Sequence, residues 1–106
     1  MELKSFTVEP EVVRLGGSAR YTAMTYCPTG RMIEVAFVTK RGETVVDAPK
    51  YSRVSNCSGG VVSSNNGGYV FSNSLESLGE YTVTVTVYDQ NAGVTVSDTK
   101  PLTVIP

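Results

Sequence analysis

Hydrophobic and polar residues alternate along much of this chain, most regularly in the stretch LGEYTVTVTVYD between Leu78 and Asp89. Successive side chains of a β-strand project to opposite faces, so this alternation buries one face and leaves the other in water. The pattern predicts a long strand of a β-sandwich, preceded by a turn at Gly79. The apolar set is Tyr81, Val83, Val85 and Val87, and the outer set is Thr82, Thr84, Thr86 and Tyr88.

The same period of two predicts further strands, separated by turns rich in Gly, Pro and Asn. These strands cover residues 3–8, 12–15, 19–25, 31–39, 44–47, 69–72 and 94–105. Residues 50–68 are the least regular part of the chain. Tyr51 to Cys57 is compatible with an edge strand, and we expect the whole segment to be an exposed, mobile excursion.

The last predicted strand contains a conflict. Val94, Val96, Leu102 and Val104 share one face, yet Asp98 and Lys100 fall on that face between them, and Pro101 follows. Charged side chains and Pro are tolerated on edge strands and at bulges. We therefore expect an edge strand with a bulge or kink over residues 98–101.

The strand over residues 31–39 is apolar on both faces. Ile33, Val35 and Phe37 form one face, and the other carries Met32, Ala36 and Val38 with Glu34 as its one charged residue. Such a strand is either central and covered on both sides, or it presents a hydrophobic patch to a partner.

Length and charge limit the function. A chain of 106 residues corresponds to one domain, residues 1–106, and its 9 Lys and Arg against 10 Asp and Glu give a net charge of -1. This charge creates no field that would gather nucleic acid. Residues 1–20 contain no apolar run long enough for a signal peptide or a membrane span, so no membrane partner is expected. Met1 directly precedes the first strand, as in a complete small protein or an excised domain.

Cys27 and Cys57 are the two cysteines, and the chain has no His. Two cysteines without His do not make a zinc site. A disulfide closing a loop of about 30 residues would contribute roughly 3 to 4 kcal/mol. The sequence leaves this bridge open, and two free, mostly buried thiols are the simpler interpretation.

About seven strands with evenly spaced turns are typical of an all-β, immunoglobulin-like β-sandwich with two antiparallel sheets. Residues 8–23, with a first strand broken by Pro10 and a Gly turn before the second strand, resemble the opening of bacterial and phage immunoglobulin-like domains. Residues 78–83 resemble the Gly-x-Tyr-x-Val corner of those domains and of polycystic-kidney-disease repeats. The resemblance implies that Gly79 and Tyr81 stabilise this corner, with the Tyr81 hydroxyl bonded to backbone.

Catalytic chemistry finds little support. Without His, the commonest general base is missing, and the carboxylate pairs Glu76 with Glu80 and Glu43 with Asp47 stand at turns among solvated residues. Asp89 and Asn91 offer too few oxygens for Ca²⁺ and are better explained by turn geometry. We expect a protein that is not an enzyme and uses no cofactor or metal.

Surface recognition remains as the expected function. The resemblance implies an auxiliary or decoration protein that attaches to the capsid subunits of a phage virion after synthesis in the host cytoplasm. The alternative is a module of a bacterial surface or secreted protein, acting as a spacer or binding a glycan. Further surface candidates are the 50–68 segment and the loop over residues 89–93. The residues expected at the partner interface are Met32, Glu34, Ala36, Val38, Tyr51, Val61, Val62 and Tyr88.

Overall fold

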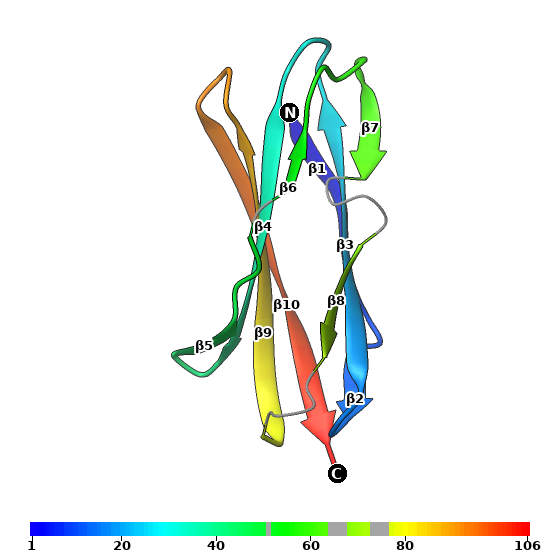
Figure 1. Ribbon diagram of the computed structural model, residues 1–106, viewed down its shortest axis with the longest axis vertical. Helices are drawn as coiled ribbons and strands as arrows, with labels where there is room; N and C mark the ends of the chain where they lie inside the picture. The colour runs from blue at the N-terminus through cyan, green and yellow to red at the C-terminus, as the bar shows by residue number, and fades with distance from the viewer. Residues whose placement is uncertain (51, 64–67, 73–76) are drawn as a thin grey trace.

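The computed structural model describes residues 1–50, 52–63, 68–72 and 77–106, and none of these residues is helical. They form strands that run along the long axis of the molecule (Figure 1). The strands are β1 (Glu2–Glu9), β2 (Val12–Arg14), β3 (Ser18–Cys27), β4 (Ile33–Arg41), β5 (Thr44–Asp47), β6 (Ser52–Val54), β7 (Gly60–Ser63), β8 (Tyr69–Ser72), β9 (Gly79–Asp89) and β10 (Val94–Ile105).

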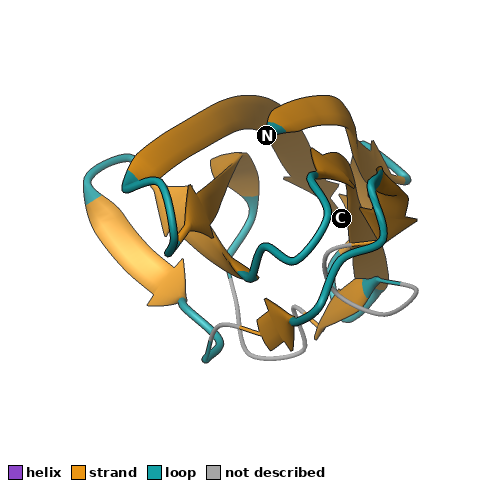
Figure 2. Cartoon of the chain, turned by 90° about the horizontal axis from the view of Figure 1, so that it is seen from above, coloured by secondary structure: helices purple, strands orange, loops and turns teal. Residues whose placement is uncertain are grey.

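The strands form two sheets that enclose a common interior (Figure 2). One sheet has the order β1-β3-β7, and β8 also pairs with β3. The other has the order β2-β10-β9-β4-β5, and β6 also pairs with β4. The pairs are antiparallel except for β2 with β10, which is parallel. The consecutive strands β1 and β2 belong to different sheets, and the chain passes between them at the cis peptide Glu9-Pro10.

The core confirms the alternation predicted from the sequence. Val83, Val85 and Val87 on β9 have no solvent-accessible surface. Aromatic side chains from both sheets meet in this interior. The Phe6 and Phe37 ring centroids are 6.1 Å apart, and those of Tyr21 and Phe37 are 5.7 Å apart. Burial of this apolar surface is the main force that holds the two sheets together.

The bulge expected over residues 98–101 is wrong. β10 pairs with β9 without a register shift, from Val94 opposite Asp89 to Val104 opposite Gly79. The edge position was predicted correctly for most of the strand, because β2 pairs only with residues 103–105. Asp98 is exposed, and its carboxylate accepts the amide N–H of Thr99 at 2.9 Å. Charge on the inward face is therefore tolerated because this edge is open to water.

The segment over residues 50–68 is also more regular than expected. In its described part, Ser52–Val54 pairs with β4 and Gly60–Ser63 pairs with β3, so the chain crosses from one sheet to the other. The edge-strand interpretation is right for residues 52–54. The paired residues belong to the sheets and are not a loop, although Ser52, Arg53 and Val61 are exposed as expected. The sequence pattern of β6 and β7 was weak because these strands are only three and four residues long. Tyr51 and residues 64–67 lie outside the described residues.

Candidate interaction surface

Loops from three distant parts of the chain meet at one end of the molecule, at the top of Figure 1. They are residues 28–32 between β3 and β4, residues 55–59 between β6 and β7, and residues 89–93 at the turn between β9 and β10. We call this group of residues the clipped end. The loop 89–93 and part of the 50–68 segment were predicted as separate surface candidates, and the fold brings them together.

A disulfide joins two of these loops. Cys27 at the end of β3 and Cys57 are bonded to each other, with their Cα atoms 5.7 Å apart, so the interpretation as two free thiols is wrong. Backbone hydrogen bonds reinforce this link. The Gly30 amide donates to the Cys57 carbonyl at 2.7 Å, and the Cys57 amide donates to the Arg31 carbonyl at 3.2 Å. Both sulfur-bearing residues are buried, with exposed fractions of 0% and 5%.

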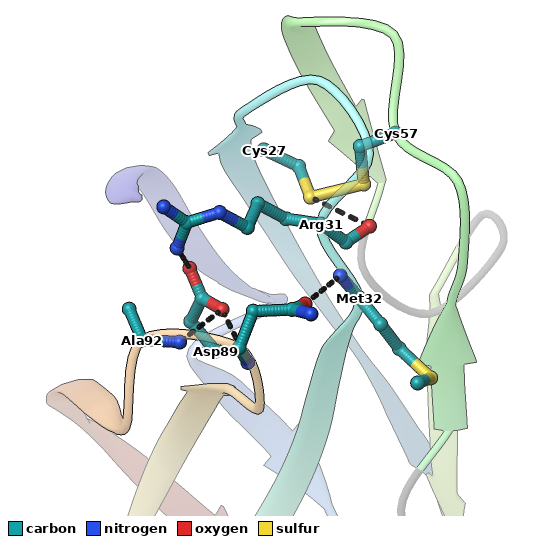
Figure 3. A network of polar contacts seen from close by, with 7 residues as sticks. Cys27, Arg31, Met32, Cys57, Asp89 and Ala92 are labelled. Atoms are coloured by element: carbon teal, nitrogen blue, oxygen red, sulfur yellow. Dashed lines mark hydrogen bonds and ion pairs between the residues drawn. A yellow bond between two sulfur atoms is a disulfide. The ribbon is translucent and has the colours of Figure 1, made fainter.

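The Asp89 carboxylate fixes the third loop (Figure 3). Its Oδ2 accepts a hydrogen bond from Arg31 Nη1 at 3.0 Å. Its Oδ1 accepts the backbone amides of Asn91 at 3.0 Å and Ala92 at 3.2 Å. Asp89 is only 1% exposed, so these donors replace the water that a carboxylate requires. The turn-geometry interpretation of Asp89 is confirmed, because the carboxylate bonds to its own turn.

The same loop is tied to the start of β4. The Met32 amide donates to the Asn91 side-chain oxygen at 2.9 Å (Figure 3). The Gln90 amide donates to the Met32 carbonyl at 3.1 Å. Each of the three loops is thus bonded to at least one of the others. Loops that are cross-linked in this way lose little conformational entropy when a partner binds.

The outer face of β4 and β9 adjoins the clipped end. Glu34 on β4 lies directly opposite Tyr88 on β9 and Arg53 on β6. Arg53 Nε is 3.2 Å from Glu34 Oε1, and the Glu34 side chain is only 14% exposed. Oε1 itself is buried and accepts no hydrogen bond from the residues that the structure describes. Tyr88 remains 39% exposed beside this ion pair.

The predicted interface residues divide into two groups. Glu34, Ala36 and Val38 share the outer face of β4, and Met32 directly precedes this strand. All four are half-buried, and Tyr88 lies opposite Glu34 on β9. β4 is flanked by β9 and by β5 and β6, so it is a central strand.

The other group belongs to the second sheet. Val61 on β7 is exposed next to Tyr26, whereas Val62 packs against the core. Tyr51 lies outside the described residues.

Two residues of the surface were missed by sequence reasoning. Arg31 reaches a carboxylate 58 positions away, and Arg53 pairs with a residue on another strand. No local pattern marks either contact, because both depend on strand register.

The predicted corner lies at the opposite end of β9. Gly79 has φ +130, a conformation that side chains with a Cβ rarely adopt. Tyr81 is 1% exposed, and its hydroxyl donates to the carbonyl oxygen of Ser77. These residues belong to the fold and do not contribute to the clipped end.

The tyrosine hydroxyls of the interior, those of Tyr21 and Tyr69, form hydrogen bonds that stabilise the fold. The Tyr21 hydroxyl lies 2.9 Å from Thr39 Oγ1, and burial raises the pKa of Tyr21. Burial, together with a 2.7 Å hydrogen bond to Asp47, raises the pKa of Tyr69 to about 12. Asp47, one member of a predicted carboxylate pair, thus accepts a hydrogen bond from a tyrosine. Glu76 of the other pair lies outside the described residues.

The described residues contain neither a candidate metal-binding cluster nor a membrane-spanning helix. No group of three or more His, Cys, Asp and Glu side chains is placed to hold a metal ion. No helix long and apolar enough to cross a membrane occurs among them.

The comparisons with known proteins bear on the fold. No family model and no curated protein matches the sequence. Among solved structures, the chain is similar to the sporulation control protein Spo0M from Bacillus subtilis, with a TM-score of 0.66 and 14% sequence identity. The match covers 99% of this chain and 49% of that one, so the chain spans about half the length of that protein. The likeness shows a shared all-β fold.

Proposed function

We propose that this chain is a non-enzymatic attachment module with an immunoglobulin-like sandwich, which binds a partner protein through the clipped end and the adjoining face of β4 and β9. The strand orders support the fold: β1-β3-β8 and β10-β9-β4-β5 follow the order A-B-E and G-F-C-C′ of variable-type immunoglobulin sheets. The hydrogen bond from Tyr81 to Ser77 has the form of a tyrosine corner in such domains.

The observation that carries the function is the cross-linking of the loops at one end. Loops at the ends of a rigid sandwich are the usual place for recognition in such domains. A solvated loop that binds no partner does not require a disulfide, a buried carboxylate and a side-chain amide to fix its conformation. Here the disulfide, Asp89 and Asn91 together order all three segments.

The chemistry of the surface suits a protein partner. Met32 and Tyr88 provide apolar and aromatic contacts among polar loop residues, a mixture typical of protein interfaces. A stable complex buries about 800 Å² on each partner. We assign the partner as a virion subunit, with the chain as an auxiliary protein of a phage head, on the basis of the resemblance of residues 8–23 and 78–83 to phage domains.

Washed virions test this assignment. We expect the chain to remain on particles of its source phage after high-salt washing, at a fixed ratio to the capsid subunit, as measured by mass spectrometry. Tyr88→Asp should release it. Val45→Asp should not, because Val45 lies on β5, which pairs with the end of β4 that is remote from the clipped end. Val45 is a matched control because it is also exposed, at 52% against 39% for Tyr88. Absence from washed particles, or equal retention of both variants, would contradict the proposal.

The disulfide supports a second candidate, a module of a bacterial surface or secreted protein. Disulfides persist in oxidising surroundings, which include cell surfaces as well as virions. A glycan could then stack on Tyr88 and bond to Glu34 and Arg53. Detection of the chain on intact cells rather than on particles, with cell-wall polysaccharide bound by the native chain and not by Tyr88→Asp, would favour this candidate.

A further inference from the structure

The clipped end depends on one covalent bond that can be broken and formed again. Cys57 lies in a segment flanked by β6 and β7, strands of three and four residues. Asn56 and Gly59 beside it have φ values of 53 and 86, which are left-handed conformations. Asn adopts this region more readily than other non-Gly residues, so residues 56–59 form a tight turn around Cys57.

The hydrogen bonds of the loops continue outward from the disulfide. The Cys57 amide and carbonyl bond to Arg31 and Gly30, so they hold the turn between β3 and β4. Arg31 then reaches Asp89 with its guanidinium, and Asp89 holds the amides of the last loop. Release of Cys57 would thus remove a constraint on Arg31 and, through it, on residues 89–93.

The body of the sandwich has its own support. β9 pairs with β10 along its whole length and with β4 over eight positions from Ile33 to Lys40. Val83, Val85 and Val87 are fully buried between these strands and the other sheet. Cys27 and Cys57 also belong to the buried core, at one end of the sandwich, whereas the backbone ladders of β9 with β4 and β10 do not involve either residue.

We propose that the Cys27–Cys57 disulfide is a redox switch that keeps the clipped end ordered in the oxidised chain and releases its three loops, without melting the sandwich, in the reduced chain. This inference rests on the proposed function, since it assigns regulation to that same surface. Attachment would follow oxidation, so a chain made in a reducing cytoplasm would bind tightly only after reaching oxidising surroundings.

The chemistry is thiol–disulfide exchange with a dithiol. Because both cysteines are buried, the 55–59 segment must first open locally. A thiolate of the dithiol then attacks the Cys57 sulfur and forms a mixed disulfide, and Cys27 leaves as a thiolate that takes up a proton. The second thiol of the dithiol then displaces Cys57. The dithiol ends as a cyclic disulfide, two electrons are transferred to the protein, and both cysteines become thiols.

Amide hydrogen exchange of the isolated chain tests the switch without any partner. The native chain is compared with the chain reduced by dithiothreitol and with the double variant Cys27→Ala, Cys57→Ala. We expect amides of residues 28–32, 55–59 and 89–93 to exchange roughly tenfold faster or more in both disulfide-free forms, while core amides of β9 change much less. Equal rates in all three forms, or loop and core amides that accelerate together, would overturn the proposal.

A separate variant tests the path. Arg31→Gln keeps the disulfide and removes the ion pair to Asp89. It should speed exchange in residues 89–93 and leave residues 55–59 as they are. Unchanged exchange in residues 89–93 would show that the loops are not coupled through Arg31.

Binding to particles that lack the chain separates the two proposals. We expect the reduced chain to bind with an affinity at least roughly tenfold lower than that of the oxidised chain, because its loops must be ordered on binding and this costs free energy. If neither form binds, the proposed function fails, and the exchange result alone decides the switch. If both forms bind equally, the attachment function stands and its redox regulation is refuted.

Discussion

Substitution of Asp89 by Ala removes the acceptor that holds the loop between β9 and β10. The carboxylate accepts one hydrogen bond from a guanidinium and two from backbone amides, at 3.0 to 3.2 Å. Hydrogen bonds to charged groups make a net contribution of about 1.5–3 kcal/mol each, and this range applies when a freed partner stays buried away from water. The Arg31 side chain is 38% exposed and the loop amides belong to exposed residues, so water replaces part of what is lost. We expect a net loss of about 3 kcal/mol.

Urea unfolding followed by circular dichroism measures this loss. Asp89→Asn keeps an oxygen for the two amides and loses the ion pair, so it should cost about half as much as Asp89→Ala. Asp98→Ala is the matched control, because Asp98 is exposed and accepts one local amide. It should change the free energy of unfolding by no more than about 0.5 kcal/mol. Equal effects of Asp89→Ala and Asp98→Ala would refute the role given to the buried carboxylate.

Further predictions concern the core, the edge and the response to pH. Tyr21→Phe should lower the free energy of unfolding by about 1–2 kcal/mol, because it leaves the fully buried Thr39 hydroxyl without its hydrogen bond to Tyr21. The double variant Tyr21→Phe, Thr39→Val should be little less stable than Tyr21→Phe alone. The double variant Asp98→Val, Lys100→Val removes the charges that keep the β10 edge from pairing with another chain, so light scattering should show concentration-dependent association. The double variant Asp98→Ser, Lys100→Ser should not associate. The pKa of Tyr69 is raised from 10.0 to about 12 in the folded chain, so the contribution of its hydroxyl to stability is complete below pH 10 and falls as the pH rises toward 12. The urea midpoints of the native chain and of Tyr69→Phe should therefore converge between pH 10 and 12.

The strands were predictable wherever burial imposes a strict period of two. β9 and β4 follow this rule because both lie inside their sheet. β6 and β7 escaped it because short strands give too few residues to define a period. In β10, the charged residues Asp98 and Lys100 were read as a break in the strand. An edge strand accepts charges on its inward face while its ladder continues, and the sequence alone does not distinguish the two arrangements.

The candidate surface was predictable in its parts and not as a whole. Met32, Tyr88 and the loop 89–93 were each identified as surface features from their local sequence. Their convergence with residues 55–59 depends on the return of the chain after β6, which carries no local signal. The disulfide was undecided for the same reason, since two cysteines 30 positions apart pair only if the fold places their Cα atoms within reach.

The most direct test of this account is a hydrogen-exchange footprint of the oxidised chain on washed phage particles, the partner that the proposed function assigns. The account predicts protection of residues 28–32, 55–59 and 89–93 and of the outer face around Tyr88. Protection of the opposite end instead, at the β4–β5 turn or around Ser77 and Gly79, would contradict it.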